Sequence, residues 1–122
     1  MEMRSIKPHK RLDVWNMAID LTVEIYRLSD NFPKNEIYGL TSQMRRAAVS
    51  TPSNIAEGAA RQTKKEFINY LHTAQGSLSE LDTQLLIAFK LGYFSEAAQM
   101  ETEKKVETIS KMLTGLIKSL KR

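Results

Sequence analysis

The chain has 122 residues, a length that suits one domain built around a single core. Hydrophobic residues make up 42% and charged residues 26%, which are ordinary proportions for a globular chain and argue against intrinsic disorder. The absence of cysteine excludes disulfides and thiolate metal sites, and it fits a cytoplasmic location.

The charge balance is modestly basic. The formal net charge is +4 and the isoelectric point is about 9.4, values that favour anionic partners. The opening residues, MEMRSIKPHKRLD, are polar and predict no secretory signal. No apolar run approaches the ~18 residues of a membrane span, so we expect no membrane association.

The first predicted helix covers about residues 12–28 and follows an N-terminal arm, residues 1–10. Two neighbouring apolar stripes recur along it at helical spacing. One stripe comprises Leu12, Trp15, Ile19, Val23 and Tyr26, and the other comprises Val14, Ala18, Leu21, Ile25 and Leu28. Together they form a wider apolar face than a monomeric bundle needs, which predicts an oligomer. Pro33 prevents the helix from continuing.

The second predicted helix covers about residues 36–57 and is interrupted by Pro52. Its inner stripe comprises Ile37, Leu40, Met44, Ala47, Ala48, Thr51 and Ile55. Two outcomes remain open at the proline. Either the helix kinks because Pro52 cannot donate to the carbonyl of Ala48, or Thr51 caps a new helix with Pro52 at its first position. Gly58 is the expected C-terminal stop.

Two further helices have clear boundary signals. Thr63 and Glu66 form the T-x-x-E pattern of a capping box, and Gly92 supplies a left-handed cap about 28 residues later. Gly76 in the middle of this third helix suggests a close packing contact, although it can equally be incidental. The fourth helix begins after Ser95, a suitable N-cap, and reaches almost to Arg122.

Four amphipathic segments joined by short turns bury one another best as antiparallel neighbours. The sequence therefore predicts an all-α protein: one antiparallel up-down four-helix bundle over residues 1–122, with a kink or break near Pro52. No strand pattern competes with this interpretation.

No catalytic constellation is visible, so we predict a protein that is not an enzyme and holds no cofactor or metal. His9 and His72 are far apart in the sequence. A di-iron bundle needs E-x-x-H motifs, but Asn69 follows Glu66 and Thr83 follows Glu80 at that spacing. The chain also lacks a phosphate-binding P-loop motif.

Basic residues cluster within about twenty positions. We interpret Arg45, Arg46, Arg61, Lys64 and Lys65, aided by the N-terminal arm, as candidate phosphate contacts for nucleic acid. The alternative is solvated side chains and local pairs such as Arg61 with Glu57, or packing of Arg46 against a helix or subunit. No aromatic residue interleaves the cluster, so the expected binding is independent of base sequence.

The segment QMRRAAVSTPSNIAEG, residues 43–58, resembles the hallmark of the 23S rRNA intervening-sequence protein family. The segments LDVWNMAIDL (12–21), FPKNEIYGL (32–40) and EFINYLHTAQGSLSELDTQLLIAFKLGYF (66–94) resemble the family's first helix, first turn and third helix. The similarity covers roughly residues 9–120.

The resemblance implies a four-helix bundle that assembles as a ring, typically a homopentamer, with no assigned catalytic residue. Some members are encoded inside insertions in bacterial large-subunit rRNA genes. Accessory proteins of diversity-generating retroelements are similar in fold and bind nucleic acid and a reverse transcriptase. We therefore expect a non-enzymatic oligomer that binds RNA or DNA. The alternative is a scaffold for a partner protein without any nucleic-acid role.

Overall fold

A computed structural model describes residues 8–122, and every regular element in that range is helical. A short 3₁₀ helix, η1 (Pro8–Arg11), precedes α1 (Asp13–Ser29), and a second, η2 (Lys34–Glu36), precedes α2 (Leu40–Ala59). The last two helices are α3 (Lys64–Lys90) and α4 (Glu96–Leu120). The predicted all-α fold class is confirmed. The first seven residues of the expected arm lie outside the described range.

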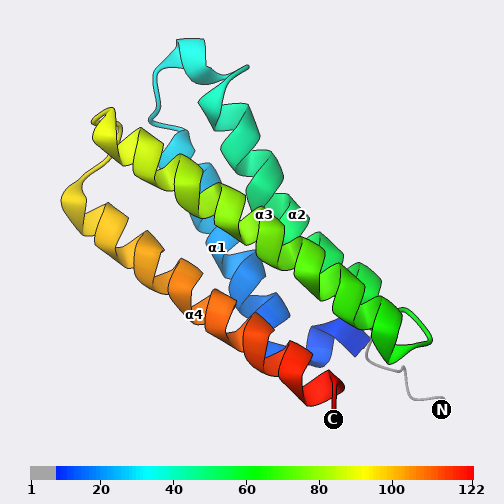
Figure 1. Ribbon diagram of the computed structural model, residues 1–122. Coiled ribbons are helices and arrows are strands. Elements are labelled where there is room, and N and C mark those ends of the chain that lie inside the picture. The colour runs from blue at the N-terminus through cyan, green and yellow to red at the C-terminus, as the bar shows by residue number, and fades with distance from the viewer. Residues whose placement is uncertain (1–7) are drawn as a thin grey trace, which may run out of the picture.

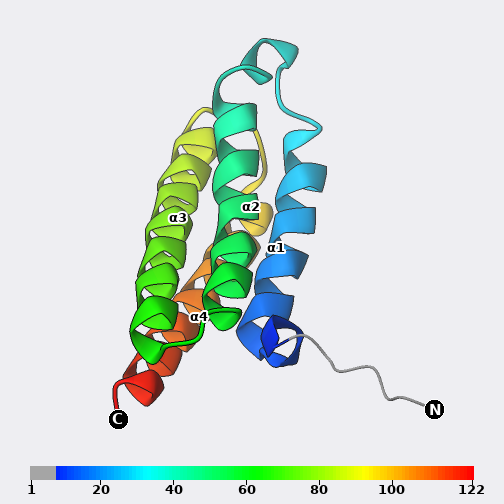
Figure 2. The same ribbon diagram turned by 90° about the vertical axis from the view of Figure 1, so that its right-hand side faces the viewer.

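The four long helices run alternately up and down, and each packs on its two neighbours in chain order, with α4 closing against α1. Figures 1 and 2 both place the α2–α3 turn and the last residues of α4 at one end of the bundle, beside η1. The α1–α2 and α3–α4 connections lie at the opposite end. The antiparallel up-down arrangement thus gathers three separate parts of the sequence at a single end.

Only one of the two apolar stripes of α1 is fully buried in the core, and Leu12 and Trp15 of the other stripe are partly buried against it. Val14, Ala18, Leu21 and Ile25 are buried, as the second stripe requires. On the first stripe Trp15 and Ile19 are half-buried, while Val23 and Tyr26 are 43% and 42% exposed. A band of apolar surface therefore remains along the outside of α1.

Helix α2 runs through Pro52 without a break, so the alternative in which Thr51 caps a new helix is wrong. The proline has no N–H to offer the carbonyl of Ala48. The hydroxyl of Thr22, on α1, lies 2.9 Å from that carbonyl oxygen and is placed to donate to it. It also lies 2.8 Å from the carbonyl of Ala18 in its own helix. A donor from the neighbouring helix thus replaces the one that Pro52 lacks.

The expected start of helix two at Glu36 is wrong, because α2 begins at Leu40 after the short η2. Ile37 consequently leaves the inner stripe and is 48% exposed. Glu36 instead accepts hydrogen bonds, from the N–H of Leu40 at 3.4 Å and from the Tyr93 hydroxyl at 2.7 Å. The second bond joins the α1–α2 connection to the α3–α4 turn, and it raises the pKa of Tyr93 above its ordinary value.

Helices α2 and α3 share the most extensive contact, and they approach each other closely at Gly58. A Cβ at this position would lie 2.7 Å from the Cβ of Tyr70 and 2.9 Å from Cδ1 of Phe67. Gly58 therefore does not stop α2, which continues to Ala59; it allows close approach of α3. Gly76, which suggested such a contact, faces open space.

The caps of the last two helices match their sequence signals. The Thr63 hydroxyl oxygen accepts the N–H of Glu66 at 3.2 Å and donates to its carboxylate at 2.9 Å. Gly92 has a φ of +81°, and Tyr93 N–H reaches the carbonyl of Ala88 at 3.1 Å, which is a Schellman ending. Ser95 accepts the N–H of Ala98 at 3.1 Å and caps α4. Within residues 8–122, no helix is long and apolar enough to cross a membrane.

Candidate nucleic-acid interface

The structure divides the five candidate basic residues between two ends of the bundle. Arg45 and Arg46 lie in the second turn of α2, whereas Arg61, Lys64 and Lys65 lie around the α2–α3 turn. The fifteen residues from Arg46 to Arg61 span roughly 22 Å at a helical rise of 1.5 Å per residue. These five residues, although close in sequence, therefore do not form one surface on a single chain.

The side chain of Arg45 joins α2 to the C-terminal end of α1. Its Nε donates to the Ser29 hydroxyl at 2.9 Å, and its Nη2 donates to the carbonyl of Tyr26 at 3.3 Å and to Asp30 at 3.0 Å. The guanidinium also lies 4.7 Å from the centroid of the Tyr26 ring. It thus places a positive charge at the negative C-terminal end of α1, where the helix dipole favours a cation.

Arg46 points outward from α2 and is exposed. It borders a hollow of about 250 Å³ between α2 and α3, together with Ser50, Ser77 and Glu80. Ser50 and Ser77 form a hydrogen-bonded pair at 2.8 Å across this seam. Among the described residues, Arg46 makes no hydrogen bond or ion pair, so its charge is available to a partner.

Arg61 forms the ion pair with Glu57 that its i,i+4 spacing predicts, at 2.9 Å. The same Nη2 atom lies 2.6 Å from the Tyr70 hydroxyl oxygen, and the guanidinium carbon lies 4.9 Å from the centroid of the Tyr70 ring. Tyr70 and Glu57 raise the pKa of Arg61 above its ordinary value. The side chain of Arg61 remains 40% exposed, so these contacts fix its position without covering it.

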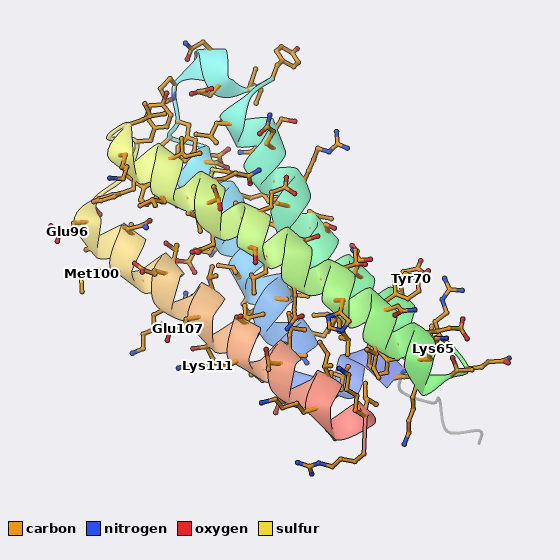
Figure 3. The ribbon with its side chains drawn as sticks, in the orientation of Figure 1. Lys65, Tyr70, Glu96, Met100, Glu107 and Lys111 are labelled. Carbon is orange, nitrogen blue, oxygen red and sulfur yellow. The ribbon has the colours of Figure 1, made fainter. Side chains whose placement is uncertain are left out.

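Lys64 and Lys65 occupy the first turn of α3, and both are exposed. Neither makes an ion pair in the described part of the chain. Their charges lie at the positive end of the α3 dipole, where a cation is unfavourable. Figure 3 shows Lys65 and Tyr70 at the same end of the bundle, far from Glu96 and Met100.

Three basic residues of the α4 terminus reach this end as well, namely Lys118, Lys121 and Arg122, all of them exposed. The bond from Gln75 Nε2 to Thr114 Oγ1, 3.1 Å long, sets α3 and α4 in register. The helices are antiparallel, so Ile68, seven residues before Gln75, and Lys121, seven residues after Thr114, lie at about the same level. We call these three residues, together with Arg61, Lys64 and Lys65, the basic end.

The aromatic component of this end was not visible in the sequence. Tyr70 is nine residues from Arg61, beyond the i,i+3 and i,i+4 spacings at which helical side chains meet. The α2–α3 turn folds the two helices back on each other and brings Tyr70 to Arg61. The expectation that no aromatic ring accompanies the basic cluster is thus wrong for the folded chain.

The histidines have different surroundings, and neither makes an ion pair with an acidic side chain of residues 8–122. His9 packs edge-on against Trp15, with ring centroids 4.9 Å apart, and His72 lies 3.2 Å from the Gln75 side-chain oxygen. Over the described residues, no three histidine, aspartate or glutamate side chains lie close enough together to hold a metal ion.

Comparisons with known proteins identify relatives of the chain. The family model for the 23S rRNA-intervening sequence protein matches residues 10–115. A crystal structure of a protein of unknown function from the S23 ribosomal protein family of Bacteroides thetaiotaomicron is similar, with a TM-score of 0.78. It is 23% identical in sequence, and the match covers 86% of this chain and 98% of that one. A search of curated proteins found no significant match.

Proposed function

The chain belongs to the 23S rRNA-intervening sequence protein family, and on that premise we propose that it is a non-enzymatic, oligomeric bundle that binds RNA or another nucleic acid through its basic end. The observation that carries the proposal is the placement of Lys64 and Lys65. They oppose the dipole of α3 and have no acidic partner in the described range, so stability does not explain them. A bound phosphate would be attracted by both lysines and by the helix end.

The mechanism is neutralisation of phosphates with release of counterions. Arg61 and the basic residues of α4 extend the positive surface beyond the two lysines. Oligomerisation multiplies the number of contacts: five copies of a +4 chain, the number implied by the family resemblance, carry a formal charge of about +20. We expect Arg45 to contribute little to phosphate binding, because its guanidinium is bonded to the end of α1, whereas the exposed Arg46 can act as a separate phosphate contact.

The apolar band on α1 supports the oligomer. Trp15 and Ile19 border a hollow of about 320 Å³ between α1 and α2, where Val49 is 41% exposed. Val23 and Tyr26 are further exposed apolar side chains on α1, and charged residues of α1 and α4 surround Val23. Several exposed apolar side chains on the outside of one helix are typical of a protein contact, and a second copy of the chain is the partner we propose.

Sedimentation at micromolar concentration tests the oligomer. The wild-type chain should sediment well above the 13.9 kDa of a monomer. Val23→Lys should dissociate the assembly, whereas Ser110→Lys, an exposed position on α4, should leave it intact. A monomeric wild-type protein would refute the oligomer.

Nucleic-acid binding is tested by fluorescence anisotropy with a labelled RNA at low salt. Replacing Lys64 and Lys65 by alanine should weaken binding of all sequences alike. The matched control replaces Lys34 and Lys90, exposed lysines near the opposite end, and should bind like wild type. If the assembled wild-type protein binds neither RNA nor DNA at low salt, the proposal fails. The apolar band then favours a scaffold for a partner protein.

A further inference from the structure

The basic end contains one planar group held in place on an aromatic ring. The Arg61 guanidinium lies over Tyr70 with its carbon 4.9 Å from the ring centroid. Two bonds from Nη2, to the Tyr70 hydroxyl oxygen at 2.6 Å and to Glu57 at 2.9 Å, fix its position. The side chain of Arg61 is nevertheless 40% exposed.

The backbone beneath this pair is fixed by the tight contact at Gly58. Because Gly58 has no side chain, α3 approaches α2 until Tyr70 Cβ and Phe67 lie against the backbone of α2. Arg61 follows Gly58 by three residues, and its N–H donates to the carbonyl of Gly58 at 3.1 Å. The guanidinium is thus supported from both helices, and forming this surface for a ligand requires little further ordering.

Phosphate binding alone does not account for this arrangement. A phosphate contact needs only charge, which Lys64 and Lys65 supply from the adjacent turn. A guanidinium laid over an aromatic ring is instead a flat, weakly hydrated surface, of the kind on which unpaired bases stack. A duplex hides its base faces between neighbouring pairs, whereas a single strand exposes them.

Building on the nucleic-acid binding proposed above, we infer that the preferred ligand is single-stranded nucleic acid, with one base stacked on the Arg61–Tyr70 pair and the adjoining phosphates on Lys64 and Lys65. Every base has a π-face, so this contact selects strandedness and not sequence. The lysines lie three and four residues beyond Arg61, at the start of α3, so backbone and base are contacted by neighbouring parts of one turn.

The test compares three labelled ligands by fluorescence anisotropy, using the assembled protein at low salt. They are a twelve-nucleotide oligo-dT, an abasic strand with the same number of phosphates, and a twelve-base-pair duplex. Loss of one stacking contact should weaken binding about tenfold. We expect oligo-dT to bind about tenfold more tightly than the abasic strand, and also more tightly than the duplex.

Arg61→Lys keeps the charge and removes the planar group. It should reduce oligo-dT affinity about tenfold and leave the abasic strand unaffected. Arg27→Lys is the matched control, because Arg27 is exposed in the last turn of α1, at the opposite end of the bundle, and no aromatic ring lies under its guanidinium in the described structure. This change should alter neither affinity. Tyr70→Leu should reproduce the Arg61→Lys result, with helicity and sedimentation measured to confirm an intact assembly.

Two results are distinguishable from each other. Equal binding of oligo-dT and the abasic strand, or an Arg61→Lys variant that behaves like wild type, overturns the stacking contact while leaving phosphate binding intact. Absence of binding to all three ligands overturns the nucleic-acid function itself, and the stacking contact with it.

Discussion

Replacing Thr22 by valine tests how α2 tolerates a proline in its interior. The two side chains are similar in shape, so the main change is loss of the hydroxyl that serves the carbonyl of Ala48. The carbonyl of Ala18 keeps its helical donor, the N–H of Thr22, because both residues lie within α1. Only the Ala48 carbonyl loses its donor, since Pro52 cannot supply one.

The expected cost follows from burial. Ala48 is 2% exposed, so water cannot readily replace the lost donor. An unsatisfied buried carbonyl costs about 1–3 kcal/mol, and the added methyl group of valine offsets part of this, which leaves ~1–2 kcal/mol. For a chain of this size, that corresponds to a fall in Tm of roughly 4–8 °C.

A double-mutant cycle isolates the effect. In a Pro52→Ala background, residue 52 has an N–H that donates to Ala48, so Thr22→Val should cost less than about 0.5 kcal/mol. Urea unfolding followed by circular dichroism, at one fixed protein concentration, measures all four free energies. Thr73→Val is the control, because its hydroxyl serves only the i−4 carbonyl of α3. Equal costs of Thr22→Val in both backgrounds would show that the Thr22 hydroxyl does not replace the N–H that Pro52 lacks.

Three further predictions concern packing, capping and pH. Gly58→Ala should lower the free energy of unfolding by ~1–3 kcal/mol through overpacking, whereas Gly76→Ala, facing open space, should raise it by ~0.5–1 kcal/mol. Changes in the free energy of unfolding that have the same sign at both sites would contradict this. Thr63→Ala should lower the free energy of unfolding by about 1 kcal/mol, and an unchanged urea midpoint would mean that this N-cap does not stabilise the fold. Because the folded pKa of Tyr93 is raised above 10.0, its bond to Glu36 should stabilise the fold below about pH 10 and lose its effect as pH rises through the folded pKa. Tyr93→Phe should therefore destabilise at pH 8 and much less in strong alkali, as unfolding at the two pH values can show.

Local features of the fold were predictable from the sequence because their partners are three or four residues apart. Thr63 with Glu66 and Ser95 with Ala98 are contacts of this kind, and they fix where α3 and α4 begin. The helical period of α1 identified both of its apolar stripes, but it did not show which of the two is buried in the core. The continuity of α2 did not, since the donor that replaces the missing N–H of Pro52 comes from Thr22, on a different helix.

The two glycines show the same limit. From the sequence, we expected Gly58 to end the second helix and Gly76 to mark a close packing contact. In the structure, Gly58 makes the close contact, because Gly58 lies where the α2–α3 turn brings Tyr70 and Phe67 against α2. Such roles depend on which helix faces lie opposite each other, and that is set by the tertiary arrangement.

The candidate site was predictable only in part for a similar reason. Clustering in the sequence grouped Arg45 and Arg46 with the basic residues at the α2–α3 turn, but the length of α2 separates the two groups by roughly 22 Å. Conversely, Tyr70 and the basic residues of α4 reach the basic end only through the up-down arrangement of the helices. The sequence identified charges, and the fold determined which of them share a surface.

The salt dependence of nucleic-acid binding tests the central claim most directly. Affinities of the assembled wild-type protein and of the variant with Lys64 and Lys65 replaced by alanine are measured for a single-stranded RNA over a range of salt concentrations. We expect a steep linear fall of log affinity with log salt concentration, with a slope smaller by about 1.4 in the variant, or ~0.7 for each lost phosphate contact. Equal slopes for the two proteins, or no binding by the wild type at low salt, would contradict it.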